Sequence, residues 1–162
     1  MPRCEVSESI AAPSDEVFDL VHDYDRRLRW DTLLSAAYLT GGFTKAGEGV
    51  TSVCVGRASL GRLALETVYV SFKRPDVAAV KMLNSPPFFG TWAASIRHVD
   101  TAPRESRITY TFHFTGRPRW LRWLVEPIVL RVLRWETKQR LRALQQYFAL
   151  GALDPGRPRG RG

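Results

Sequence analysis

Cysteine is scarce in this chain of 162 residues, and the metal-binding patterns that depend on it are missing. The two cysteines, Cys4 and Cys54, belong to no CxxC pair and to no Cys/His cluster. We therefore expect neither a disulfide framework nor a structural zinc site. Such sparse cysteine usage is typical of a protein that works in a reducing cytoplasm.

Long apolar runs are absent as well. The first residues, MPRCEVSESIAAP, lack the continuous apolar segment of a secretion signal, and no run approaches the ~20 residues that span a membrane. We expect a soluble protein of the cytoplasm.

Common catalytic motifs are also missing from the sequence. The sequence contains no Ser/His/Asp arrangement, no HExxH, no GxGxxG and no P-loop. Because these motifs mark catalytic triads, zinc peptidases and nucleotide sites, we predict no metal and no cofactor. We therefore expect function to depend less on a catalytic signature than on what fills the space inside the fold.

Acidic residues are few in the second part of the chain. Residues 1–96 carry 10 Lys or Arg and 11 Asp or Glu, whereas residues 97–162 carry 14 and 5. This asymmetry fits attraction to phosphate, in nucleic acid or at an anionic membrane, and it also fits a merely solvated helix face. The last residues, DPGRPRGRG, have nothing to bury, so we predict one domain, 1–150, and a disordered basic tail, 151–162.

The chain does contain a long series of strand-like segments. They are rich in Val, Thr, Tyr, Phe and Ile and are separated by turn sequences such as KAGEG, RPD and NSPP. Their connections are too short for crossover helices, which predicts a largely antiparallel sheet. The seven predicted strands are Cys4–Ile10, Ala36–Thr40, Gly49–Ser59, Arg62–Lys73, Val77–Leu83, Thr91–Val99 and Ser106–Thr115.

Three helices are predicted. A short one follows Pro13, where acidic residues occupy the first turn, and a second short one spans Tyr24–Trp30. The third covers Arg119–Leu150 and would be roughly 45 Å long at about 1.5 Å per residue. Pro127 should kink or divide it. Its sheet-facing residues, three or four positions apart, are Leu130, Leu133, Thr137, Leu141, Leu144 and Phe148.

Alternation predicts which strand residues face inward. The last strand should turn Ile108, Tyr110, Phe112 and Phe114 toward the core. The register between Trp92 and Val99 stays open, because a slip of one residue would reverse that strand's two faces.

Glu66 is conspicuous within the segment Arg62–Lys73. Alternation groups this carboxylate with Val68, Val70 and Phe72. If that face is buried, Glu66 needs a partner such as Arg97 or has a raised pKa. The alternative is an edge position or a bulge that turns Glu66 to water.

Two segments carry a resemblance to a known superfamily. The opening SESIAAPSDEVFDLVHDYDRRLRW and the closing RPRWLRWLVEPIVLRVLRWETKQRLRALQQYF resemble the SRPBCC superfamily, which includes START lipid-transfer domains and polyketide cyclase/dehydrase-like proteins. The likeness covers residues 4–150. It implies an α+β helix-grip fold, in which a seven-stranded curved antiparallel sheet wraps around a long C-terminal helix, with two short helices after the first strand. It also implies an apolar ligand held between sheet and helix.

Large apolar and amphipathic side chains are the candidate wall of such a cavity, although each could equally belong to plain core packing. The candidate ligand-binding residues are Trp30, Glu66, Phe72, Met82, Trp92, Tyr110, Phe112, Leu133 and Leu141.

Catalysis by a cyclase-like protein would need a general acid or base at the ligand. The candidates are Glu66, Tyr110, His98 and His113. His113 falls in phase with threonines and should face solvent, and His98 and His22 lie near element ends, where histidine is often innocuous.

The segment RPRWLRWLVEPIVLRVLRW interleaves arginines with Trp120, Trp123 and Trp135. It could dock on an anionic bilayer with the indoles at headgroup level, or its tryptophans could cover the cavity rim while its arginines extend to water. Nucleic acid is a poorer partner, because no aromatic strand platform accompanies the basic residues.

Three functions follow from these observations. The first is binding of a hydrophobic small molecule or lipid in a cavity between the sheet and the C-terminal helix. The second is a polyketide cyclase/dehydrase-like enzyme that acts without metal on a small aromatic or polyketide substrate. The third is a module that binds a membrane surface or a protein partner.

Overall fold

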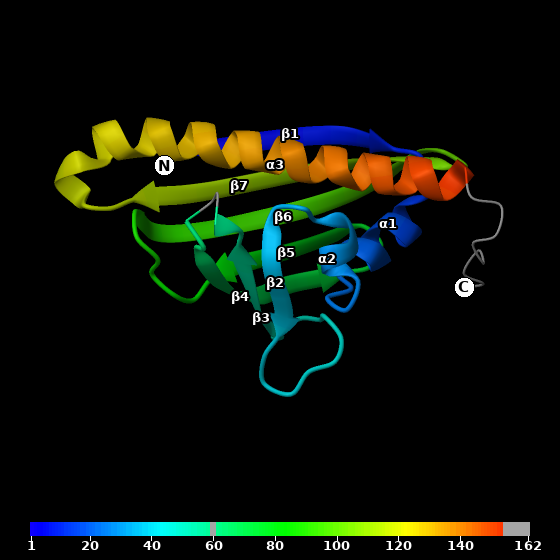
Figure 1. The fold of residues 1–162 in the computed structure, drawn as a ribbon, viewed down its shortest axis with the longest axis horizontal. Helices are drawn as coiled ribbons and strands as arrows, with labels where there is room; N and C mark the ends of the chain where they lie inside the picture. The colour runs from blue at the N-terminus through cyan, green and yellow to red at the C-terminus, as the bar shows by residue number, and fades with distance from the viewer. Residues whose placement is uncertain (59–60, 154–162) are drawn as a thin grey trace.

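One antiparallel sheet dominates the computed structural model, which describes residues 1–58 and 61–153 (Figure 1). Within these residues the sheet has seven strands in the order β1-β7-β6-β5-β4-β3-β2. The helix-grip architecture predicted from the sequence is therefore confirmed. The strands are β1 (Arg3–Ile10), β2 (Leu34–Leu39), β3 (Thr51–Gly56), β4 (Ala64–Lys73), β5 (Val77–Met82), β6 (Phe89–Ala102) and β7 (Glu105–Gly116).

The first strand, β1, forms one edge of the sheet. Strands β2 to β7 follow one another as antiparallel neighbours, and β1 pairs with β7 rather than with β2. The sheet curves, and the long helix lies along β1 and β7 on its concave side (Figure 1).

Two short helices join β1 to β2. Helix α1 (Ser14–Val21) begins after Pro13, carries Asp15 and Glu16 in its first turn and buries Val17, Phe18, Leu20 and Val21. Helix α2 covers only Arg27–Trp30, so it begins three residues later than predicted. Together they place His22, Tyr24 and Arg27 on the concave side of the sheet.

A single-turn 3₁₀ helix, η2 (Arg119–Leu121), leads into the long helix α3 (Arg122–Leu153). Helix α3 runs through Pro127 without a break, so the predicted alternative of a divided helix was wrong. Proline lacks the N–H that would bond to the carbonyl of Trp123, but buried Val125 anchors the same turn. The predicted disordered tail falls mainly on residues 154–162, which lie outside the described residues.

The sheet-facing side of α3 is the predicted one. Thr137, Leu141 and Leu144 are buried, and Leu130, Leu133 and Phe148 pack against the same core. At about 1.5 to 3 kcal/mol for each fully buried large side chain, this contact is a main contribution to stability.

The inward faces of β6 and β7 are settled by their pairing. Trp92 lies opposite Phe114, Ala94 opposite Phe112 and Ile96 opposite Tyr110, and all six are buried. This confirms the alternation predicted for the last strand. It also fixes the register left open near Trp92.

In strand β4, the inward and outward faces differ from the alternation predicted around Glu66. Leu65, Thr67 and Tyr69 face the concave side, whereas Val70 is 46% exposed. The pairing with β5 shifts between Tyr69 and Ser71, and this irregularity returns Phe72 to the inside, where it contacts Phe18. Glu66 is half-buried on the other face, so the predicted grouping of Glu66 with Phe72 was wrong.

Candidate functional site

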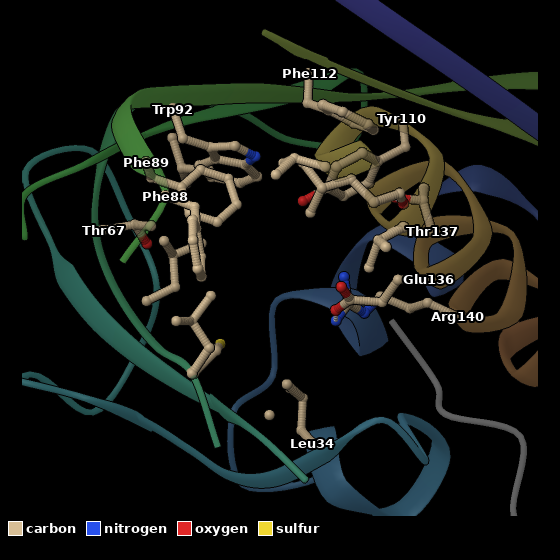
Figure 2. A pocket seen from close by; sticks show the side chains of 18 of the residues that line it. Leu34, Thr67, Phe88, Phe89, Trp92, Tyr110, Phe112, Glu136, Thr137 and Arg140 are labelled. Carbon is tan, nitrogen blue, oxygen red and sulfur yellow. Dashed lines mark hydrogen bonds and ion pairs between the residues drawn. The ribbon is translucent and has the colours of Figure 1, made fainter. Parts of the chain in front are cut away.

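A cavity of about 640 Å³ lies between the concave face of the sheet and helix α3 (Figure 2). The helix lines it with one face, and β2 to β7, α2, the segment between α1 and α2 and the segments around Leu63 and Phe88 supply the rest. Cavities of roughly 300 to 1,000 Å³ with mainly apolar walls are the usual sites for small molecules. The principal apolar lining residues are Leu65, Phe89, Trp92, Phe112, Val129 and Leu133.

One end of the cavity opens to solvent between the β5–β6 loop and α3. Phe88 is 60% exposed, Ile128 58% and Val132 47%, yet all three line the cavity. An apolar ligand can therefore enter without crossing a polar rim at these positions. We call Phe88, Ile128 and Val132 the mouth.

The opposite side of the cavity holds a buried ion-pair network. Asp31 Oδ2 accepts hydrogen bonds from Nε of Arg27 (3.0 Å) and from Nε of Arg140 (2.8 Å), and Nη2 of Arg140 donates to Glu136 Oε1 (3.0 Å). The Asp31 side chain is fully buried, whereas Arg27, Glu136 and Arg140 line the cavity. We call these four residues the polar cluster.

Burial and charge oppose each other in the polar cluster. Burial alone would raise the pKa of Asp31, but Arg140 and Arg27 hold that pKa below its ordinary value. Burial would lower the pKa of Arg140, yet Asp31 and Glu136 raise it. Asp31 and the two arginines therefore stay ionised at neutral pH, as a buried pair with good geometry does.

A second polar group connects α1 to β3 and β4. The His22 Nδ1 and Tyr69 hydroxyl lie 2.9 Å apart, the hydroxyls of Tyr69 and Tyr24 lie 3.2 Å apart, and Tyr24 donates to Ser52 Oγ (3.0 Å). Burial, with His98 and Arg27 nearby, lowers the pKa of His22 well below 6.5, and burial raises that of Tyr69 well above 10.0. His22 is thus neutral at pH 7, while Tyr69 keeps its proton.

Four predicted ligand-binding residues line the cavity: Trp92, Tyr110, Phe112 and Leu133. The other five lie elsewhere. Trp30 is buried with the Arg27 guanidinium 4.9 Å from its ring centre, and Leu141 and Met82 pack in the main core. Phe72 belongs to a second core cluster with Phe18 and Tyr69, and Glu66 lies on the outer face of β4.

Of the catalytic candidates, only Tyr110 lines the cavity, and burial raises its pKa to about 12. His98 is buried beside Phe18 and His22, and burial lowers its pKa to about 4. His113 lies between inward-facing Phe112 and Phe114 and so points to the other face, as does Glu66.

Sequence reasoning did not single out the polar cluster or treat His22, Tyr24 and Tyr69 as a site. One signal was present: Arg27 and Asp31 are four residues apart, and so are Glu136 and Arg140, the spacing that favours ion pairs on a helix. The second pair interrupts the apolar face of α3 next to Thr137.

The family model described as "Polyketide cyclase / dehydrase and lipid transport" matches residues 1–149 of this chain. Among the curated proteins, a sequence search finds no match.

Solved structures with the same fold share little sequence with this chain. The Zhui aromatase/cyclase from Streptomyces sp. R1128 superposes with a TM-score of 0.76 at 16% identity, over 96% of this chain and 98% of that one. A START superfamily protein from Mycobacterium smegmatis gives 0.77 at 9% identity, over 91% and 97%. Norcoclaurine synthase from Thalictrum flavum gives 0.67 at 12% identity, over 94% and 87%. At such identities the likeness shows the fold alone.

Proposed function

This chain belongs to the polyketide cyclase/dehydrase and lipid-transport family of the SRPBCC superfamily, and from that membership we propose that it binds a hydrophobic small molecule or lipid between its sheet and helix α3. The observation that carries the proposal is the 640 Å³ cavity with mainly apolar walls. Trp92, Phe112 and Leu133 would contact the apolar body of the ligand, and Tyr110 would orient it.

Native mass spectrometry after gentle purification tests this proposal. We expect a co-purified apolar compound that a cavity-filling variant, Val129→Trp, no longer retains. Leu124→Trp is the matched control, because Leu124 lies on the same helix, is 44% exposed and is not among the lining residues. A wild-type protein that binds no apolar compound, either from the cell or added to micromolar concentration, would refute the proposal.

We also propose that η2 and the N-terminal half of α3 dock on an anionic membrane surface. Trp120 is 77% exposed, Trp123 74% and Trp135 52%, and none of them is among the described residues that line the cavity. The expectation that indoles cover the rim is therefore not supported. Arginines flank them, and the exposed Ile128 and Val132 of the mouth belong to the same helix, so a docked helix would hold the mouth near the lipid.

Liposome sedimentation tests the docking. We expect pelleting with phosphatidylserine vesicles at low salt, much less at high salt, and little with neutral vesicles. The double variant Trp120→Ala/Trp123→Ala should bind more weakly, whereas Phe43→Ala, which removes an exposed aromatic side chain from the β2–β3 loop, should not. Equal pelleting with neutral and anionic vesicles would exclude the electrostatic contribution.

A catalytic role is the second candidate, and one observation favours it. His22 is neutral, lines the cavity and is hydrogen-bonded through Tyr69 to Tyr24, so the cavity contains a possible base and proton donors in contact. If the co-purified ligand is a substrate, incubation with excess protein should change its mass by a defined step such as loss of water. Tyr69→Phe should abolish that change while the ligand stays bound.

A cytoplasmic location is the last part of the proposal. Cys4 and Cys54 are both free thiols, which fits a reducing compartment. No helix in the described part of the chain is long and apolar enough to cross a membrane. Cell fractionation would test the location directly.

A further inference from the structure

The polar cluster keeps hydrogen-bonding capacity that no other residue in the described part of the chain uses. Arg27 donates through Nε and Nη1, to Asp31 and to the carbonyl of Val21, and Arg140 donates through Nε and Nη2. A guanidinium has five N–H groups, so each arginine retains donors. Within residues 1–58 and 61–153, Glu136 accepts at Oε1 only from Arg140, which leaves acceptor capacity on its carboxylate. All three side chains line the cavity.

The charges of the polar cluster cancel. Arg27 and Arg140 contribute two positive charges, and Asp31 and Glu136 contribute two negative ones. Both carboxylates are engaged by the arginines, and His22 nearby is neutral at pH 7. Glu136 would repel a ligand group with a full negative charge, and the two guanidinium groups would repel one with a full positive charge. A neutral group that both donates and accepts a hydrogen bond avoids both repulsions.

On this basis we propose that the polar cluster is a head-group subsite that selects a ligand with a neutral hydroxyl group on an apolar body. The hydroxyl would donate to Glu136 and accept from Arg140. The inference rests on the proposed cavity-binding function and adds to it the chemical class of the ligand: an apolar alcohol or phenol rather than a carboxylate or a plain hydrocarbon.

The shape of the cavity gives this ligand an orientation. Figure 2 shows Glu136, Arg140, Thr137 and Tyr110 on one side of the cavity, across from Phe88, Phe89 and Trp92. Along α3, Ile128 of the mouth and Arg140 are twelve residues apart, about 18 Å at 1.5 Å per residue. The hydroxyl would lie at the buried end while the apolar body extends past Trp92 toward the mouth.

Three fluorescent probes of nearly equal size test the subsite on the full-length protein: 1-pyrenemethanol, 1-pyrenecarboxylate and 1-methylpyrene. We expect 1-pyrenemethanol to bind roughly tenfold more tightly than 1-methylpyrene, because hydrogen bonds to ionised partners are stronger than those between neutral groups. The carboxylate probe should bind more weakly than the alcohol. Dissociation constants from fluorescence titration at pH 7 give the ranking.

Glu136→Gln changes the charge of the cluster with little change of shape. The variant should bind 1-pyrenecarboxylate on the order of tenfold more tightly than wild type does, because the cluster then carries a net positive charge. Its affinity for 1-pyrenemethanol should fall, since an amide oxygen is a weaker acceptor than a carboxylate. Glu66→Gln is the matched control, because Glu66 lies on the outer face of β4, and it should leave all three affinities unchanged.

The outcomes separate the subsite from the cavity. If the three probes bind wild type equally, the subsite is refuted while cavity binding stands. If 1-pyrenecarboxylate binds most tightly, the cluster is an anion site and the proposed head group is wrong. If none binds, the cavity-binding function itself fails. The wild-type ranking decides the question even if Glu136→Gln does not fold.

Discussion

Asp31 is the residue on which the polar cluster depends. Its carboxylate is fully buried and accepts from both Arg27 and Arg140. Removing one member of a buried ion pair leaves the others uncompensated, which costs about 3 to 5 kcal/mol. We predict that Asp31→Asn lowers the free energy of unfolding by this amount in urea denaturation.

The exposed pair of Asp19 and Arg74 provides the comparison. These side chains are also hydrogen-bonded, but each is about half exposed to water. Asp19→Asn should therefore cost much less than Asp31→Asn, because water screens the exposed pair. Similar losses for the two variants would mean that burial does not strengthen the cluster.

His98 should make stability depend on pH. Burial lowers its pKa from 6.5 to about 4, so between these values the unfolded chain binds a proton that the folded chain does not. His98 alone should lower the free energy of unfolding by about 3 kcal/mol as the pH drops from about 6.5 to about 4, and its contribution should be constant below that window. His22, whose pKa is also lowered well below 6.5, should add to the fall.

The variant His98→Leu isolates the contribution of this imidazole. It removes the titrating group, and an apolar side chain suits the neighbouring Phe18 ring. Across the same window its stability should fall less than that of wild type, as measured by urea denaturation at several pH values. Parallel curves for the two proteins would show that His98 does not titrate as described.

Individual site residues were predictable only where local pattern decided their position. Tyr110 and Phe112 followed from alternation in one strand, and Leu133 from helical spacing. The bond between Asp31 and Arg140 joins residues 109 positions apart, and it depends on how α2 packs against α3. No local pattern contains that information, so the polar cluster emerged only with the tertiary structure.

At the scale of elements, strand β4 shows where alternation stops being informative. A strict period of two groups Glu66 with Phe72, but the shift in pairing between Tyr69 and Ser71 puts them on opposite faces. This irregularity depends on cross-strand pairing and on the packing of Phe72 against the rings of Phe18 and His22. The strand itself was predictable, whereas its break in phase was not.

Helix α3 should contribute to stability mainly through its sheet-facing side. Leu144 is fully buried in the main core, whereas Leu124 on the same helix is 44% exposed. We predict that Leu144→Ala lowers the free energy of unfolding by about 2 to 5 kcal/mol, since it removes buried methyl groups and leaves a cavity. Leu124→Ala should cost less than about 1 kcal/mol. If urea denaturation shows equal losses of unfolding free energy for the two variants, α3 does not stabilise the domain through its sheet-facing side.

At the scale of the whole molecule, the fold followed from the order of elements. Six consecutive strands with short connections leave little choice but an antiparallel sheet, and one long amphipathic helix must cover its apolar face. The size of the cavity between the sheet and the helix did not follow from the order of elements. The volume depends on how side chains such as Trp92 from β6 and Leu133 from α3 line the space without filling it.

This incomplete packing predicts that the domain is stabilised by whatever occupies it. A ligand that binds only the folded state adds about 2.7 kcal/mol at 100 times its dissociation constant. For a domain of this size, that corresponds to a rise in Tm of roughly 5 to 10 °C. We predict such a rise in thermal unfolding of wild type with 1-pyrenemethanol, and none with Val129→Trp, whose indole would occupy the space that the probe needs. An equal rise in both proteins would place the probe outside the cavity, because filling the cavity can abolish the effect only if the probe binds there.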